Sequence, residues 1–168
     1  FWNGGFNGSL NLMPGVQVNI FTGQALTIAS GATLSGVGST INGDLAVGSG
    51  ATISPSAEAA MGSINVSGNV TLNGTTVLRL NGSGVNDVIA SSKSITYGGM
   101  LTLTNISGSP LAAANSFELF STTNATGSFA GINPLTPGSG LAWDLSQFNS
   151  GFVSVVTASS SGPVINHP

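Results

Sequence analysis

The sequence predicts an all-β fold made of stacked coils, a β-solenoid, and three observations lead to this prediction. Residues 26–35 (LTIASGATLS) return nineteen positions later as residues 45–54 (LAVGSGATIS), and related segments begin at residues 70 and 95. Apolar and polar residues alternate within each segment, which is the period of a half-buried β-strand. Glycine recurs after each strand, where the chain must turn a corner. Such repeats are typical of stacked coils and not of a globule with a pocket.

Residues 1–25 form an atypical N-terminal segment, in which aromatic residues precede an alternating strand. The aromatic residues are Phe1, Trp2 and Phe6, and the strand residues are Val16, Val18 and Ile20. A segment this apolar has to be buried, either over the first coil of its own chain or against a neighbouring copy. We expect these six residues to mediate assembly. If they instead cap their own chain, removal of residues 1–12 should destabilise the monomer itself.

Residues 26–106 form the regular coils, and their four segments give two inward columns when read in register. The first column is Leu26, Leu45, Val70 and Ile95, and the second is Ile28, Val47, Leu72 and Tyr97. Stacking at about 4.8 Å would place like residues above like in parallel strands. The expected corners, with positive φ angles, are at Gly31, Gly50, Gly74 and Gly99. Helix has little support, and the best candidate is the short stretch 56–61.

Residues 107–160 form a C-terminal β region with a looser rhythm, and residues 161–168 are expected to be a tail or linker. This region contains Trp143 and several phenylalanines, which suits the closing of an open solenoid end. End packing is favoured for Trp2 and Trp143 over the alternative, a platform on which a sugar ring stacks.

Composition excludes several classes of function. The chain has two Lys plus Arg and five Asp plus Glu among 168 residues, with a net charge of −3. An ordinary soluble domain has roughly 25% charged residues. Without a basic patch we expect no binding to nucleic acid, and without an apolar run of ~18 residues we expect no membrane insertion. Cysteine is absent, so disulfides and thiolate metal sites are excluded. A mature secreted protein, extracellular or at the cell surface, fits this composition.

The five acidic residues are far apart in the sequence, and this argues against catalysis. They are Asp44, Glu58, Asp87, Glu118 and Asp144. Polysaccharide-cleaving sites need clustered carboxylates, and the best candidate cluster is Asp44 and Asp87 with Arg79 or Lys93. We favour instead Asp residues that bond to their own corner backbone. His167 is the single histidine, so no Ser-His-Asp arrangement is expected. We therefore expect no enzyme activity, no metal and no cofactor.

Seven Asn-x-Ser/Thr sequences are candidate glycosylation sites, a mild excess over chance. Their asparagines are Asn7, Asn65, Asn69, Asn73, Asn81, Asn105 and Asn124.

Several short motifs, in their order along residues 26–157, resemble the autotransporter-associated β-strand repeat of bacterial secreted and surface proteins. They include residues 43–55 (GDLAVGSGATISP), 95–101 (ITYGGML) and, near the end, 141–144 (LAWD) and 151–155 (GFVSV). Ser56 departs from the pattern, where a glycine usually follows the proline, and so does Ser91-Ser92-Lys93. The resemblance implies a secreted, right-handed parallel β-helix used for display, adhesion or fibre building.

Three functions remain open at this point. The leading hypothesis is an extracellular structural protein, the subunit of a filament or matrix fibre that assembles head to tail with itself by coil stacking or strand addition. The alternative is a passenger-like adhesin module that binds glycans or surfaces, which an exposed aromatic or asparagine-rich stripe would favour. The third, a polysaccharide lyase or hydrolase, would require a carboxylate cluster in a groove.

Overall fold

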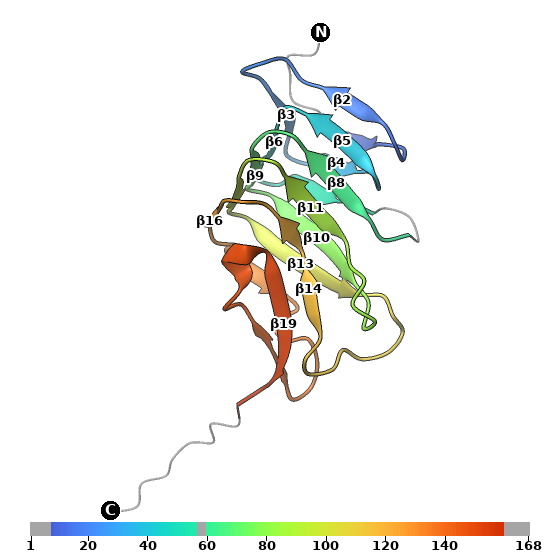
Figure 1. The fold of residues 1–168 in the computed structure, drawn as a ribbon, viewed down its shortest axis with the longest axis vertical. Coiled ribbons are helices and arrows are strands. Elements are labelled where there is room, and N and C mark those ends of the chain that lie inside the picture. Colours follow the sequence, from blue (N-terminus) through green and yellow to red (C-terminus); the bar gives the residue numbers. More distant parts are fainter. Residues whose placement is uncertain (1–7, 57–59, 160–168) are drawn as a thin grey trace, which may run out of the picture.

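The computed structural model of this chain describes residues 8–56 and 60–159, and the structural statements below concern these residues. They form three parallel β-sheets, one antiparallel sheet and one short 3-10 helix, η1 (Phe148–Ser150). The parallel sheets surround a common interior, and their strands stack along the long axis of the molecule (Figure 1). The prediction of an all-β fold built from parallel strands is confirmed, and the arrangement is consistent with a β-solenoid.

The chain visits the three parallel sheets in turn, and each strand inside a sheet pairs with the strands one coil before and after it. The first sheet contains β1 (Ser9–Asn11), β4 (Thr33–Ser35), β7 (Thr52–Ser54), β10 (Thr75–Leu80), β13 (Met100–Asn105) and β17 (Gly131–Asn133). The second contains β2 (Gln17–Asn19), β5 (Ser39–Asn42), β8 (Ser63–Val66), β11 (Val88–Ser91) and β15 (Phe120–Ser121). The third contains β3 (Ala25–Ile28), β6 (Asp44–Val47), β9 (Val70–Leu72), β12 (Ile95–Tyr97) and β16 (Ala125–Gly127).

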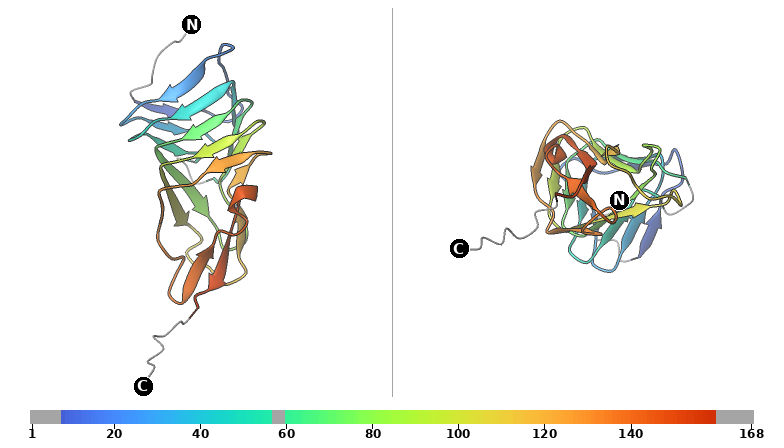
Figure 2. Two further views of the ribbon diagram at one scale, coloured as in Figure 1. Left: turned by 90° about the vertical axis from the view of Figure 1, so that its left-hand side faces the viewer. Right: turned by 90° about the horizontal axis from the view of Figure 1, so that it is seen from below.

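The antiparallel sheet consists of β14 (Ser116–Glu118), β19 (Phe152–Thr157) and β18 (Leu141–Asp144), with β19 in the middle. It lies at the opposite end of the molecule from β2 (Figures 1 and 2). Phe117, Val153 and Val155 of this sheet are buried in the same core as the parallel strands. One continuous core therefore runs through the coils into the antiparallel sheet.

The two inward columns expected from the repeats lie in the third sheet. Leu26, Leu45, Val70 and Ile95 are successive partners, and so are Ile28, Val47, Leu72 and Tyr97. All eight residues are 5% exposed or less. Since full burial of a Leu or Val side chain stabilises by about 1.5–3 kcal/mol, these columns are a major part of the core.

The coils continue beyond the four repeats at both ends. β1 pairs with β4 and β2 with β5, so the described part of the N-terminal segment supplies two strands of the first coil. At the other end β16 pairs with β12, which places Ala125 beside Ile95 and Gly127 beside Tyr97. Because small residues stand at these inward positions, β16 lacks the alternation of large apolar and polar residues that identifies the other strands in the sequence.

Glycine is required at the corners for two different physical reasons. Gly31 and Gly50 have φ angles of 81° and 76°, a region that favours glycine. For Gly74 and Gly99 the expectation of a positive φ angle is wrong. A Cβ atom at either position would instead collide with backbone carbonyl oxygens of the preceding coil, those of Ala51 and Gly74 respectively. Stretch 56–61 has no helix in its described part, and residues 57–59 lie outside the described residues.

Candidate functional site

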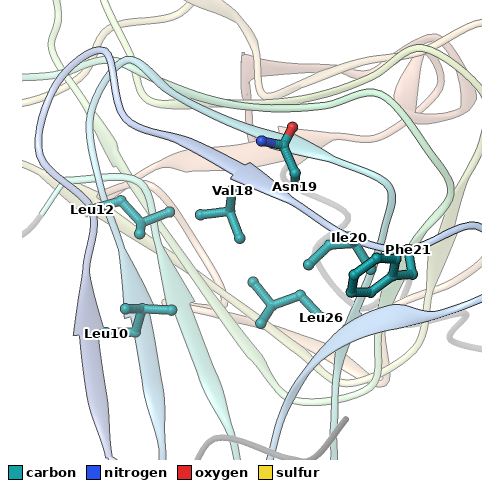
Figure 3. A pocket seen from close by; sticks show the side chains of 7 residues that line it. All are labelled: Leu10, Leu12, Val18, Asn19, Ile20, Phe21 and Leu26. Carbon is teal, nitrogen blue, oxygen red and sulfur yellow. The ribbon is translucent and has the colours of Figure 1, made fainter. Parts of the chain in front are cut away.

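The N-terminal end of the coils is an apolar hollow of about 250 Å³. Figure 3 shows its lining, which comes entirely from the first coil: Leu10, Leu12, Val18, Asn19, Ile20, Phe21 and Leu26. Leu10, Val18 and Ile20 are only partly buried against the core. An interior this apolar is open at this end among the described residues, and a covering group would gain from the hydrophobic effect.

Three strands around this hollow have edges that no other described strand pairs with. β1, β2 and β3 are each the terminal strand of their sheet within the described part of the chain. None of these strands contains a charged residue or a proline, the usual means of protecting an edge. Of the residues expected to mediate assembly, Val18 and Ile20 line the hollow, whereas Val16 lies outside it and is 36% exposed. Phe1, Trp2 and Phe6 lie outside the described residues.

Asp87 is the centre of a buried polar cluster that ties three parts of the chain together. Its Oδ1 accepts hydrogen bonds from Ser56 Oγ at 2.6 Å and from the backbone N–H of Gly62 at 3.0 Å. Its Oδ2 accepts from the backbone N–H and the Nε of Arg79, at 3.0 and 3.1 Å. The Arg79 guanidinium also donates to the Ala60 carbonyl oxygen. Asp87 is fully buried and fully bonded, which is the arrangement of a structural ion pair.

Three other acidic residues of the described part, Asp44, Glu118 and Asp144, lie apart from this cluster. Asp44 begins β6 in the third sheet, where its Oδ1 accepts from the backbone N–H of Asn69 at 2.7 Å. Asp144 Oδ1 accepts from the backbone N–H of Ser146 at 2.9 Å, and this bond holds the pKa of Asp144 below its usual range. The expected bond to the local backbone is therefore right for Asp144. It is wrong for Asp44, which bonds to the next coil, and for Asp87, which bonds to Arg79 eight residues earlier and to Ser56 and Gly62 of the preceding coil. Glu118 lies on the exposed side of β14.

No chemistry-bearing cluster joins these groups in the part of the chain that the structure describes. Over residues 8–56 and 60–159 there is no group of three or more His, Asp or Glu residues that could hold a metal ion. Glu58 and His167 lie outside the described residues. Asp44 and Asp87, the best candidate pair from the sequence, belong to different corners of the coils, and Asp87 has no exposed surface.

Most of the described sequon asparagines bond within the protein. The Oδ1 atoms of Asn81 and Asn105 each accept from the backbone N–H and hydroxyl of a serine two residues on, which forms a local turn. Asn69 donates to Asp44 and accepts from Ser94 Oγ, so it links three successive coils. Asn65 donates to the Ser39 carbonyl oxygen. Asn73 and Asn124 are exposed, and Asn7 lies outside the described residues.

An aromatic cluster fills the interior where the coils meet the antiparallel sheet. The Tyr97 ring lies 4.9 to 5.1 Å from the rings of Phe120, Phe129 and Phe148. Beside it is a second hollow of about 400 Å³, lined in part by Phe129, Phe148 and Ile132. Trp143 is half-buried and donates its indole N–H to the Pro134 carbonyl oxygen. This contact agrees with end packing for Trp143 and not with a free sugar platform.

A polar groove of about 340 Å³ follows the corner between the second and third sheets. Its polar side chains come from four successive coils: Thr22, Gln24, Asn42, Asp44, Ser67 and Lys93. Beside it Asn42 Nδ2 donates to Asn19 Oδ1 at 2.8 Å, so amide side chains form a short ladder across coils. Sequence reasoning missed this groove because its members are spread over seventy residues and share no motif.

Comparisons with known proteins give no relative. No protein-family model matches the chain, and no curated protein and no solved structure is significantly similar to it. Among the described residues, no helix has the length and apolar character needed to cross a membrane.

Proposed function

We propose that this chain is an extracellular structural protein, the subunit of a surface filament or matrix fibre that assembles head to tail with itself. The observation that carries the proposal is the N-terminal end of the described residues, where β1, β2 and β3 are the terminal strands of their sheets, contain no charged residue and surround an apolar hollow. Parallel edges of this kind are templates for another strand or coil. Within this proposal the coils are a right-handed β-helix, the antiparallel sheet is its C-terminal cap, and the chain is akin to the autotransporter-associated repeat.

The difference between the two ends supports an open filament. The N-terminal end is a coil edge, whereas the opposite end carries the antiparallel sheet (Figure 1). A contact between unlike surfaces is heterologous, and it generates a filament when the rotation between copies does not close a ring.

The test places lysines on the end strands and, as a matched control, on the same outward columns inside the stack. The end variant is Ser9→Lys with Gln17→Lys. The control is Thr75→Lys with Ala90→Lys, whose positions belong to the same columns as Ser9 and Gln17. Electron microscopy and light scattering of purified protein are expected to show filaments for the native chain and the control. The end variant is expected to remain a folded monomer.

Filaments that form equally well from the end variant would contradict assembly through this end. A native chain that stays monomeric at all concentrations would contradict the filament itself. Removal of residues 1–12 is a poor test, because it deletes β1 and the buried Leu12 and so damages the fold directly.

The polar groove favours a second candidate function, an adhesin module that binds glycans. Uncharged amide and hydroxyl groups with one carboxylate and one ammonium can hydrogen-bond sugar hydroxyls. Titration calorimetry against a panel of polysaccharides would test it, with Gln24→Ala plus Lys93→Ala as the groove variant and Gln147→Ala as the control. Binding that the groove variant retains would place the glycan elsewhere, and no binding to any member would remove this candidate.

A further inference from the structure

The turn that follows β10 contains an asparagine whose side-chain oxygen accepts two hydrogen bonds. Asn81 Oδ1 accepts from the backbone N–H of Ser83 at 2.9 Å and from Ser83 Oγ at 2.9 Å. When a nucleophile attacks an amide carbon, negative charge develops on the oxygen, and donors that already point at this oxygen stabilise the charge. The Asn81 side chain is therefore held in an arrangement that favours attack at Cγ.

The backbone nitrogen of Gly82 is the nucleophile within reach of this carbon. Its attack on Asn81 Cγ closes a five-membered ring, so the chain itself holds the two reacting groups together. Within the described part of the chain, the Gly82 N–H has no hydrogen-bond partner. The nearest atom to a Cβ atom at Gly82 would be Ser107 Oγ at 3.8 Å, so this peptide unit is not crowded.

The two other Asn-Gly steps in the described residues lack this freedom. The backbone N–H of Gly43, which follows Asn42, donates to Ser67 Oγ at 3.0 Å. Gly74, which follows Asn73, is buried against backbone carbonyl oxygens of the preceding coil. The fold therefore distinguishes Asn81 from two asparagines that have the same next residue.

Asn105 has the same turn as Asn81 but not the nucleophile. Its Oδ1 accepts from the backbone N–H of Ser107 at 3.0 Å and from Ser107 Oγ at 2.7 Å. The next residue is Ile106, whose backbone N–H donates to the Leu80 carbonyl oxygen at 2.9 Å. Asn105 Nδ2 also donates to the Ser109 carbonyl oxygen at 2.6 Å. Asn105 is therefore an internal control for the effect of the turn alone.

We propose that Asn81 is a site of spontaneous deamidation. The Gly82 nitrogen forms a bond to Asn81 Cγ, the bond from Cγ to Nδ2 breaks, and the proton of the Gly82 N–H leaves with Nδ2 as ammonia. Water, the only co-reactant, then opens the five-membered imide at one of its two carbonyl carbons. Opening gives aspartate or isoaspartate at position 81, and no atom is oxidised or reduced.

The product changes both the charge and the backbone of this turn. Either product adds a negative charge to a chain whose net charge is −3. Isoaspartate also adds one carbon to the backbone of a turn that the Asn81 N–H closes by donating to the Val85 carbonyl oxygen at 2.8 Å. This inference concerns the single chain and does not rest on the proposed function.

Mass spectrometry of the folded chain, aged in mildly alkaline buffer made with ¹⁸O-water, tests the proposal. Trypsin cleaves after Arg79 and Lys93, so the peptide of residues 80–93 reports Asn81, and fragmentation assigns the label. Asn81 is expected to take up ¹⁸O several-fold faster than Asn42, Asn73 and Asn105. In urea the three Asn-Gly steps are expected to react at similar rates, because the differences come from the fold.

Two variants test the two groups that act on Asn81. Gly82→Ala is expected to slow the reaction several-fold, since a methyl group hinders approach of the nitrogen. Ser83→Ala removes the hydroxyl donor and is expected to slow it as well. Ser107→Ala, the equivalent change beside Asn105, is the matched control and should leave the rate at Asn81 unchanged.

An Asn81 that reacts no faster than Asn42 and Asn73 in the folded chain would overturn the proposal. Equal rates for the native chain and Ser83→Ala would refute the part of the hydroxyl donor. Filament formation is a separate readout, and its presence or loss bears on the proposed function alone.

Discussion

Tyr97 buries a hydroxyl group without a hydrogen-bond partner in the described structure. Its ring is held among Phe120, Phe129 and Phe148, which gives good apolar packing but no acceptor. Burial raises the pKa of the Tyr97 phenol well above its usual range, because the charged form cannot be solvated there. An unsatisfied buried hydroxyl costs about 1–3 kcal/mol. The aromatic packing of Tyr97 therefore stabilises the fold, while its buried hydroxyl group lowers the free energy of unfolding.

We predict that Tyr97→Phe raises the free energy of unfolding by about 1 kcal/mol, since the ring remains and the unsatisfied group is removed. Because the folded pKa is raised, the neutral phenol's contribution is fully present below the unfolded pKa of about 10 and is lost as pH rises above it. The native chain should therefore lose stability in alkali more steeply than Tyr97→Phe. Urea unfolding at neutral and alkaline pH measures both effects, and equal slopes would contradict the assigned burial.

The Asp87 cluster gives a second prediction at this scale. Asp87→Asn removes the charge that faces the Arg79 guanidinium, whose side chain is only 14% exposed. Breaking one partner of a buried ion pair typically costs about 3–5 kcal/mol. We expect a loss of about 3 kcal/mol by urea unfolding, with Glu118→Gln, an exposed position, as the unchanged control. If Asp87→Asn lost no more stability than Glu118→Gln, the cluster would not contribute to the stability of the fold.

At the scale of the element, the corners limit which residue can sit between stacked strands. Gly99 lies against backbone carbonyl oxygens of the coil before it, whereas the nearest atom to a Cβ atom at Gly82 would be Ser107 Oγ at 3.8 Å. Gly99→Ala forces the coils apart, and overpacking of this kind costs about 1–3 kcal/mol. We predict that loss for Gly99→Ala and almost none for Gly82→Ala, by thermal unfolding. Similar melting temperatures would show that the coils can relax at this corner.

The inward columns make a sharper prediction. Val47 is 1% exposed and lies between Ile28 and Leu72 of the neighbouring coils. In Val47→Asp a charge would enter this column with no partner to pair it, so the domain should unfold or lose most of its stability. Circular dichroism during heating measures this, with the outward Ala46→Asp as control. An unchanged melting temperature for Val47→Asp would contradict the register.

Two departures from the repeat are explained by bonds between elements. Ser56, where a glycine was expected, donates its hydroxyl to Asp87. Ser91, at the end of β11, donates to the Gly68 carbonyl oxygen at 2.7 Å and is buried. Both serines satisfy polar groups of a neighbouring segment, so they strengthen the coil contacts at positions where the repeat is irregular.

At the scale of the whole molecule, the scattered acidic residues lead to a prediction about chemistry. Retaining glycosidases place two carboxylates about 5 Å apart around the scissile bond, and inverting ones somewhat farther apart. Asp87 is fully buried in an ion pair and Asp44 lies at another corner. We expect no release of reducing sugar or unsaturated product from common polysaccharides. Reproducible turnover that is lost on mutation of any one of the five acidic residues would contradict this.

The sequence by itself determined the part of the molecule that repeats. Leu26, Leu45, Val70 and Ile95 are recognisable as a column because each coil places its residues in almost the same surroundings as the last. Alternation within a strand and a fixed offset between strands are local signals, so inward and outward faces follow from them. The same signals failed for β16, where Ala125 and Gly127 carry no apolar pattern.

Only the tertiary structure decided the contacts that do not repeat. Three arrangements are formed at one place only and do not recur from coil to coil. They are the cluster of Asp87 with Ser56 and Gly62, the aromatic group around Tyr97, and the polar groove. Such contacts depend on how loops of unequal length lie over the coils, and no period in the sequence encodes that. The apolar hollow at the first coil is also not encoded by the repeat, because it forms where the stack of described coils ends.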